Sequence, residues 1–124
     1  MSKVEYLLSH TGKTMTVNRE RSGNLWEHRK HTKEWRMIFA LLAKQAKMPR
    51  LAWCDVIVKP RQRMGKLADC GAIMPSAKAA IDGIVDASVL PDDGPEFVRS
   101  LKFEAPVRGE TGLDLLIIGV KADG

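Results

Sequence analysis

The densest group of chemically useful side chains is mostly acidic and lies between residues 69 and 93. Its members are Asp69, Lys78, Asp82, Asp86, Asp92 and Asp93. Lys78, Asp82 and Asp86 follow one another at intervals of four, so on a helix they share one face. Carboxylates that converge on one point stay ionised only when a cation neutralises them. The spacing therefore raises the question of which cation this group would hold.

The residue types in this group favour a hard metal ion. Asp69 precedes a predicted helix, and Asp92 and Asp93 follow it in a loop rich in Pro and Gly. If strands bring the two ends of this helix together beside Asp82, the carboxylates meet at one site. A site with oxygen ligands and without Cys or His favours Mg²⁺ or Mn²⁺. Magnesium takes one or two carboxylates plus phosphate and water, which suits phosphodiester hydrolysis. The simpler interpretation is a solvated helix face on which Lys78 pairs with Asp82.

The helix that carries these residues departs from good helix design. Asp82 and Asp86 place like charges on neighbouring turns, which costs a few tenths of a kcal/mol. Gly83 between them costs up to about 1 kcal/mol relative to Ala. Residues that are unfavourable for a helix, on a polar face of that helix, are a mild indication of function.

Charge is divided unequally along the chain. Residues 1–66 contain 15 basic and 5 acidic side chains, and the remainder contains 5 basic and 10 acidic ones. This division indicates a basic surface for a polyanion beside an acidic site, and nucleic acid is the natural polyanion. The expected DNA contacts are Asn18, Arg19, Arg21, Arg29, Lys30, Arg61, Arg63 and Lys66. Trp26 lies among the basic residues and is the better candidate for base stacking, whereas Trp35 fits a core position.

Apolar periodicity predicts the elements that must position these residues. Strands are expected over 4–8, 51–58, 97–107 and 113–120, and helices between Thr32 and Pro49 and over 75–87. Residues 15–17 are expected to form a hairpin strand or a loop, residues 18–31 a basic loop that enters a helix, and residues 60–66 a basic loop. The predicted fold is a single small α+β domain over 1–124, with two main helices packed on a mixed β-sheet.

Composition excludes several classes of protein. With 124 residues and 44% hydrophobic residues, the chain suits one globular domain rather than a disordered one. No apolar run is long enough to span a membrane, and Met1–Glu5 lacks the apolar core of a signal peptide. Two cysteines cannot build a disulfide scaffold, and His28 and His31 lack a third zinc ligand. We expect a cytoplasmic protein without a membrane partner.

The segment from Asp69 to Asp93 resembles the signature of the RusA-type Holliday junction resolvases, most closely the branch found in phages of actinobacteria. The shared features are an Asp before the helix, Lys-Ala-x-x-Asp from Lys78 to Asp82, and a hydrophobic stretch that ends in Asp92-Asp93. The resemblance continues more weakly through 16–19 and 34–36 and reaches the last strand. It thus covers most of the chain, and its central signature is the specific part.

The resemblance implies a small homodimeric, Mg²⁺-dependent endodeoxyribonuclease, with Mn²⁺ as a second metal. Such enzymes introduce paired nicks in four-way DNA junctions during recombination, repair or phage DNA processing, here in the host cytoplasm if a phage encodes the chain. By position, Asp69 and Asp93 match metal-site carboxylates of the family. Lys78 matches its active-site lysine, and Asp82 and Asp92 match nearby acids.

The sequence also departs from the family pattern. The better-known members have Asp-x-Asp-Asn before the helix, whereas Gly71 and Ala72 stand at the last two positions here. The interval from Asp69 to Lys78 is also three residues longer than in that form. Either Asp82 or Asp92 completes the metal site, or the protein is a non-catalytic branched-DNA-binding protein of the same fold. A small RNA-binding regulator would fit the charge but leaves the acidic group unexplained.

Overall fold

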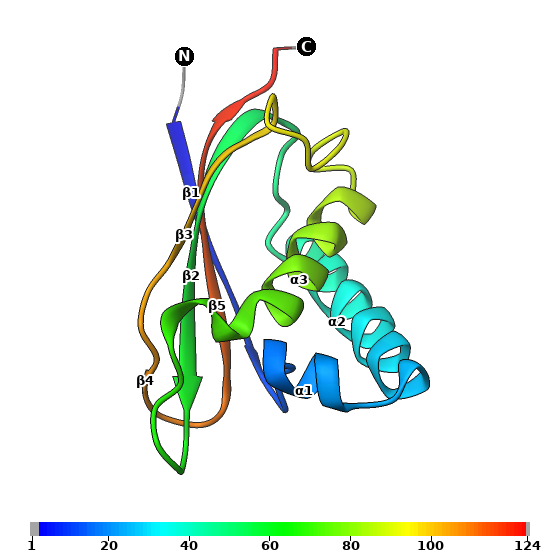
Figure 1. The fold of residues 1–124 in the computed structure, drawn as a ribbon. Helices are drawn as coiled ribbons and strands as arrows, with labels where there is room; N and C mark the ends of the chain where they lie inside the picture. The colour runs from blue at the N-terminus through cyan, green and yellow to red at the C-terminus, as the bar shows by residue number, and fades with distance from the viewer. Residues whose placement is uncertain (1–2, 124) are drawn as a thin grey trace.

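The computed structural model describes residues 3–123, which form a mixed β-sheet with all helices on one face (Figure 1). The strands are β1 (Lys3–Thr11), β2 (Leu51–Gln62), β3 (Val98–Phe103), β4 (Val107–Arg108) and β5 (Gly112–Lys121). The helices are α1 (Val17–Ser22), α2 (Leu25–Gln45) and α3 (Met74–Asp86), the last preceded by a 3₁₀ turn, η1 (Cys70–Ile73). None of these helices is long and apolar enough to cross a membrane.

The sheet combines antiparallel and parallel pairs. Its order is β1-β5-β2-β3, with β4 pairing with β2 as well. Strand β5 is antiparallel to both β1 and β2, while β3 and β4 run parallel to β2. The predicted small α+β domain with a mixed sheet is therefore confirmed.

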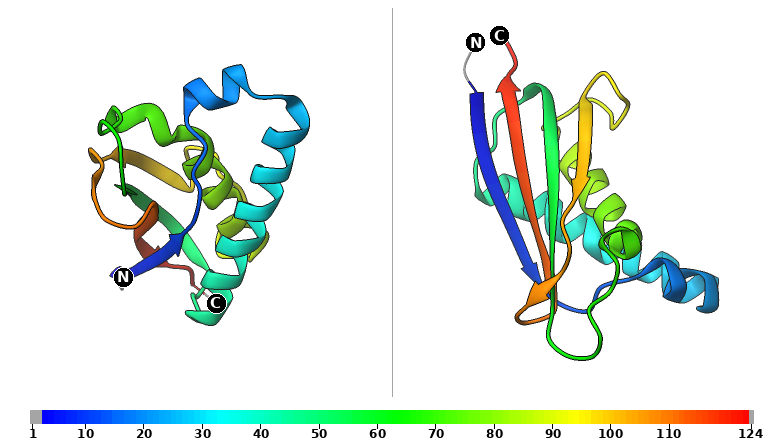
Figure 2. Two further views of the ribbon diagram at one scale, coloured as in Figure 1. Left: turned by 90° about the horizontal axis from the view of Figure 1, so that it is seen from below. Right: turned by 60° about the vertical axis from the view of Figure 1, so that its left-hand side comes forward.

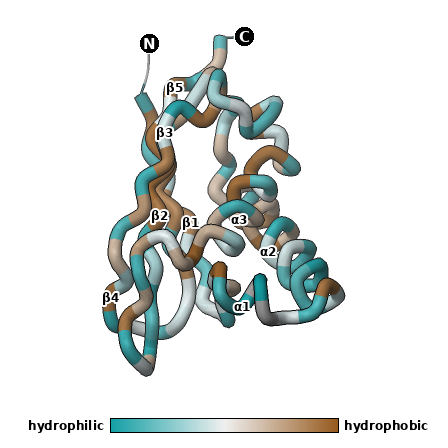
Figure 3. Tube along the Cα trace, in the orientation of Figure 1, coloured by the Kyte–Doolittle hydropathy of each residue, from teal (hydrophilic) through white to brown (hydrophobic). Residues whose placement is uncertain are grey.

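The helix-facing side of the sheet forms the core because its strands alternate apolar residues with period two. Along β5, Leu113, Leu115 and Ile117 are fully buried, and Val56 and Val58 of β2 lie beside them. Figure 3 shows hydrophobic residues gathered along the middle of β1, β2 and β5. The helices cover this layer with the buried side chains of Trp35, Phe39, Ala43, Ala77, Ala80 and Ile84.

The opposite side of the sheet carries no helix (Figure 2). Strand alternation places Ile57, Leu116 and Ile118 there, all of them half-buried, and Leu7 is 58% exposed. The guanidinium carbon of Arg99 lies 4.2 Å from the ring centre of Trp53. We call this surface the open sheet face.

Glycine at position 83 has a packing cause. A Cβ there would lie 2.5 Å from the carbonyl oxygen of Arg36 and 3.0 Å from Cβ of Phe39. Only a residue without a side chain lets α3 approach the backbone of α2 this closely. The helix-design cost of Gly83 is thus explained by helix packing, and the functional interpretation of this glycine was wrong.

Several predicted element boundaries were also wrong. Residues 18–31 are not a basic loop, because they form α1 and the first turns of α2. Asn24 rather than Thr32 caps α2, with its Oδ1 accepting a hydrogen bond from the backbone N–H of Glu27 at 2.7 Å. Periodicity missed these turns because most of their side chains are exposed and carry no apolar stripe.

The strand ends differ as well. Residues 60–62 belong to β2 and not to a loop, since Pro60 and Arg61 pair with β5. The strand expected over 97–107 is divided into β3 and β4 around Pro106. Met15 lies in the segment between β1 and α1, and is buried there.

The close crossing at Gly83 gives a direct test of the packing. Gly83→Ala should lower the free energy of unfolding by about 1–3 kcal/mol, because overpacking outweighs the gain in helix propensity. Gly71→Ala is the matched control, since a Cβ there meets nothing within 4 Å. Urea denaturation of both variants measures the difference. A Gly83→Ala protein as stable as the wild type would contradict the crossing geometry.

Candidate functional site

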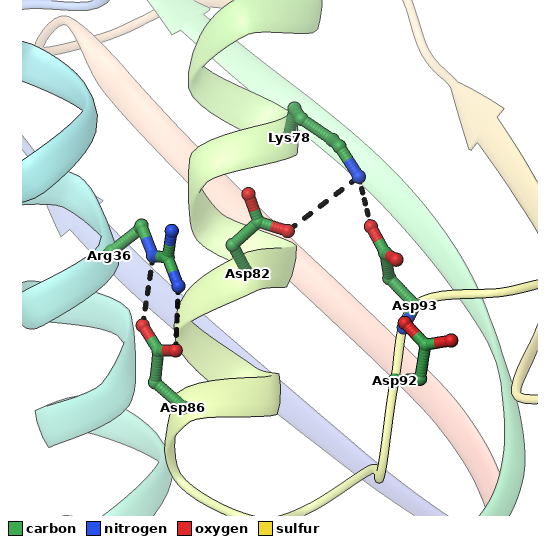
Figure 4. A network of polar contacts seen from close by, with 6 residues as sticks. All are labelled: Arg36, Lys78, Asp82, Asp86, Asp92 and Asp93. Carbon is green, nitrogen blue, oxygen red and sulfur yellow. Dashed lines mark hydrogen bonds and ion pairs between the residues drawn. The ribbon is translucent and has the colours of Figure 1, made fainter. Parts of the chain in front are cut away.

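Helix α3 presents its charged residues on the side turned away from the sheet. Lys78, Asp82 and Asp86 lie on successive turns, as the four-residue spacing predicts, while Ala77, Ala80 and Ile84 point into the core. Figure 4 shows the three charged side chains beside Arg36 of α2 and beside the loop that carries Asp92 and Asp93. We call Lys78, Asp82 and Asp93 the lysine–carboxylate cluster.

Lys78 joins two carboxylates that come from different segments. Its Nζ donates a hydrogen bond to Oδ2 of Asp93 and lies 3.6 Å from Oδ1 of Asp82. The loop after α3 folds back along the helix, so that Asp93 reaches a residue near the helix's beginning (Figure 4). One ammonium group thus lies between two carboxylates and offsets one of their two negative charges.

Asp92 shapes the loop. Its Oδ1 accepts a hydrogen bond from the backbone N–H of the next residue, Asp93, at 2.7 Å. This bond orients the Asp93 side chain toward α3 and engages one of the two oxygens of Asp92. In the cluster, Asp92 is therefore a positioning residue beside Asp93.

Arg36 is a site neighbour whose role the sequence analysis missed. Its Nε and Nη2 donate to the two carboxylate oxygens of Asp86 at 2.9 and 2.8 Å, a bidentate pair that ties α2 to α3. The hydrogen bonds from Arg36 lower the pKa of Asp86. Nothing in the spacing of two residues on separate helices indicates that they meet.

The two carboxylates of the cluster have pKa values shifted in opposite directions. The hydrogen bond from Lys78 lowers the pKa of Asp93 and raises that of Lys78 itself. Burial raises the pKa of Asp82, and this effect outweighs the favourable charges of Lys78 and Arg36. The positive charges of Lys78 and Arg36 thus offset part of the effect of burial on Asp82.

Asp69 does not join the cluster. It is an exposed residue directly before η1 and lines a small hollow of about 150 Å³ together with Arg61 and Thr111. The hollow beside Lys78 and Asp82 is lined by other residues, among them His28 and Pro75. Asp69 lies before residue 74, whereas Asp82 lies well inside α3. The helical segment 74–82 alone advances about 12 Å along the axis, at 1.5 Å per residue.

The structure thus brings Lys78, Asp82 and Asp93 into contact, sets Asp92 beside them and leaves Asp69 beyond the start of α3. Among the side chains that the structure describes, no three of His, Cys, Asp or Glu are grouped closely enough to hold a metal ion by themselves.

Arg61 has a structural role in place of the expected exposed position. Its guanidinium donates to Oγ1 of Thr11 at 3.2 Å and to the carbonyl oxygens of Glu110 and His10 at 2.8 and 3.1 Å. It also forms an ion pair with Asp114 at 3.2 Å. These contacts fasten the end of β1 to the turn before β5, which makes Arg61 a poor candidate for a DNA contact.

The other expected DNA contacts lie on the surface. Arg63 and Lys66 are exposed in the loop after β2, and the amide of Gln62 braces that loop by donating to the carbonyl oxygens of Met64 and Lys66. The remaining residues are exposed on α1 and the start of α2, at the same end of the molecule (Figure 1): Asn18, Arg19, Arg21, Arg29 and Lys30. Among these, Arg19 forms an ion pair with Glu27 at 2.6 Å.

Ser76 fixes the start of α3. Its fully buried Oγ accepts a hydrogen bond from the backbone N–H of Met15 at 2.7 Å and lies 2.9 Å from Nε2 of His31. The His31 ring in turn stacks on Trp35, with ring centres 5.1 Å apart. A serine on the otherwise apolar inner face of α3 was the signal for this contact, and the sequence analysis did not use it.

Comparisons with known proteins place the chain in no family. No protein-family model matches the chain, and no curated protein matches it. Among solved structures, it is similar to a thiamine-monophosphate kinase from Stenotrophomonas maltophilia K279a at 16% sequence identity and a TM-score of 0.37. That alignment covers 94% of this chain and 31% of the kinase chain. The chain therefore spans about a third of the kinase's length, and at this level nothing about the kinase transfers to it.

The lysine–carboxylate cluster predicts linked titrations. In Lys78→Met, the pKa of Asp93 should rise toward its ordinary value and that of Asp82 should rise further, because Lys78 lowers both. Carboxyl-detected NMR titration measures both values, with Lys33→Met on the exposed face of α2 as the control. An unchanged pKa of Asp93 would contradict the contact.

The same variant has a stability signature with a defined sign. A depressed pKa in the folded state means that the Lys78–Asp93 contact stabilises the fold above the unfolded pKa of the carboxyl group. That stabilisation is lost as the pH falls through the folded pKa. The stability difference between wild type and Lys78→Met should therefore shrink in acid.

Proposed function

We propose that the protein is a Mg²⁺-dependent endodeoxyribonuclease that cuts four-way DNA junctions, as its resemblance to the RusA-type resolvases implies. The observation that carries the proposal is the meeting of Asp82, Asp93 and Lys78, three residues of the resembling signature, although Asp93 lies 15 residues beyond Lys78. A solvated helix face accounts for Lys78 and Asp82 but gives no reason for Asp93 to return to them.

The chemistry of the cluster fits a magnesium or manganese ion. Magnesium in phosphate-handling sites is bound through one or two carboxylates, with water and substrate phosphate completing its shell. Asp82 and Asp93 are the residues that would hold it, and Asp92 keeps Asp93 in place. A bound ion would polarise the scissile phosphate and lower the pKa of a bound water.

Lys78 is the residue proposed to contact the DNA backbone within the site. Its ammonium has three N–H donors, and its side chain is 57% exposed. A donor at this place can hold a phosphate oxygen and stabilise the negative charge that develops during hydrolysis. Asp82 and Asp93 keep this ammonium charged, since the hydrogen bond from Lys78 to Asp93 raises the pKa of Lys78.

The basic end of the molecule is the proposed path of the DNA arms. Arg63 and Lys66 on one side and Arg21, Arg29 and Lys30 on the other are exposed there. Exposed cations of this kind neutralise phosphates and hold a duplex without reading its sequence. Arg61 is left out of this path because its donors are engaged inside the fold.

A homodimer is part of the proposal, because paired nicks require two active sites. A two-fold axis would relate these sites, as it relates the two halves of a four-way junction. The open sheet face is the surface proposed for the second copy. It combines apolar side chains, including Leu7, Ile57 and Leu116, with Glu5, Asp55, Lys59 and Lys102 on the same alternation. A face that carries both signs of charge can pair with itself about a two-fold axis.

A second candidate is a protein that binds branched DNA without cutting it. Lys78 already pairs with Asp82 and Asp93 and offsets one of their two negative charges, and Asp69 lies outside the cluster. Gly71 also replaces a carboxylate of the family pattern. These observations favour binding alone, and the following assay separates the two candidates.

Incubation of the protein with a four-way junction and a linear duplex, with and without Mg²⁺, tests the proposal. Paired nicks confined to the junction and dependent on Mg²⁺ are expected. Asp93→Asn should reduce cleavage at least a hundredfold while junction affinity stays equal or rises, because one negative charge near the phosphates is removed. Glu96→Gln, which removes a charge from the same loop, is the control. Junction binding without any nicking would favour the non-catalytic candidate.

Position 71 offers a gain-of-function test. A Cβ there meets nothing within 4 Å, so Gly71→Asp can add the family's second carboxylate at a position with room for a Cβ. If Asp69 belongs to a metal site, Gly71→Asp should increase Mg²⁺-dependent cleavage severalfold and lower the Mg²⁺ concentration needed. Gly71→Asn is the matched variant, because it adds the same volume without charge. Equal activity of the two variants would exclude Asp69 and position 71 from the metal site.

A further inference from the structure

A second hollow lies at the basic end of the molecule, away from the lysine–carboxylate cluster. It has a volume of about 570 Å³ and is bounded by the end of β1, the segment 12–15, Arg19 of α1 and the first half of α2. None of its lining residues belongs to the cluster, and the proposed cleavage chemistry makes no use of it.

One wall of the hollow is an exposed aromatic ring. Trp26 is 69% exposed, and Nζ of Lys30 lies 5.2 Å from its ring centre. Trp35, also in the lining, is buried and held between the rings of His31 and Phe39. Trp26 therefore adds nothing to the core, and the part of its exposed ring that Lys30 does not cover offers a flat surface on which another ring can stack.

The charges around the hollow suit a phosphate group. Lys13, Lys30 and Arg19 are in the lining, and Arg19 neutralises one of the two acids, Glu27. Glu34 is the other acid, so the lining carries a surplus of positive charge. An aromatic surface with ammonium groups beside it is the combination that binds single-stranded nucleic acid.

The polar side chains at the back of the hollow are neutral at neutral pH. Burial lowers the pKa of both His10 and His31. Neutral imidazole nitrogens donate or accept hydrogen bonds, which suits the edge of a base rather than another phosphate, although Nε2 of His31 is already engaged with Ser76. The two parts of a nucleotide thus meet matching chemistry in different parts of the lining.

We propose that this hollow binds one unpaired nucleotide of a branched DNA, with its base stacked on Trp26 and its phosphate held by Lys13 and Lys30. The inference rests on the proposed function, because it assumes a DNA substrate with an unpaired base near its branch. A base within a duplex has both faces covered by its neighbours, so only an unpaired base can stack on Trp26. The hollow is large enough for one nucleotide and too small for a duplex.

Binding of two labelled oligonucleotides tests the inference: an eight-residue oligothymidylate and an abasic oligonucleotide of the same length. Trp26→Ala should weaken binding of oligothymidylate about tenfold and leave the abasic probe unchanged, since only stacking is lost. Lys30→Ala should weaken both probes. Met37→Ala and Lys33→Ala, exposed residues of α2 outside this lining, are the matched controls and should stay within twofold of wild type.

Equal binding of both probes by the wild type, or equal effects of Trp26→Ala and Met37→Ala, would overturn the inference. The junction assay keeps this result separate from the proposed function. If the protein cleaves junctions but fails the oligonucleotide test, nucleotide binding in the hollow is refuted and the proposed function is not. If the protein binds oligothymidylate selectively but neither binds nor cleaves junctions, the proposed substrate is refuted and nucleotide binding in the hollow is supported.

Discussion

The close contact of α3 with the backbone of α2 at Gly83 is the constraint on which the arrangement of the site depends. Because position 83 has no side chain, the helices cross with the carbonyl oxygen of Arg36 against the Cα of Gly83. At the other end of α3, Ser76 is bound to Met15 and His31. Two fixed points determine the rotation of the helix, and this rotation turns Lys78, Asp82 and Asp86 outward toward Arg36 and the Asp93 loop.

The sequence predicted the elements whose side chains are sorted by burial. Helix α3 and strand β5 were found nearly to their ends, because buried and exposed residues alternate there with the period of the element. The same logic failed over 18–31, where α1 and the first turns of α2 are mostly exposed to solvent and only the helix caps, Thr16 and Asn24, mark them. Exposed helices are specified by capping and local pairs, which are weaker signals than a stripe of core residues.

The candidate site was predictable only in part. The four-residue spacing of Lys78 and Asp82 is a local property of a helix and was read correctly. The return of Asp93 to Lys78 depends on the path of the loop after α3, and spacing carries no such information; the family resemblance alone suggested it. Arg61 shows the converse limit, because a cation that appears to lie in a basic loop is bound within the fold to Thr11, Glu110 and Asp114.

The proposed divalent-cation site requires Asp82 of α3 and Asp93 of the following loop to bind one ion together. Titration of the ¹⁵N-labelled protein with Mn²⁺ tests it most directly, since the paramagnetic ion broadens amide signals close to it. The amide signals of residues 78, 82, 92 and 93 should broaden first, and excess Mg²⁺ should restore them. Broadening centred on Asp69, or spread evenly over the exposed carboxylates, would contradict the claim.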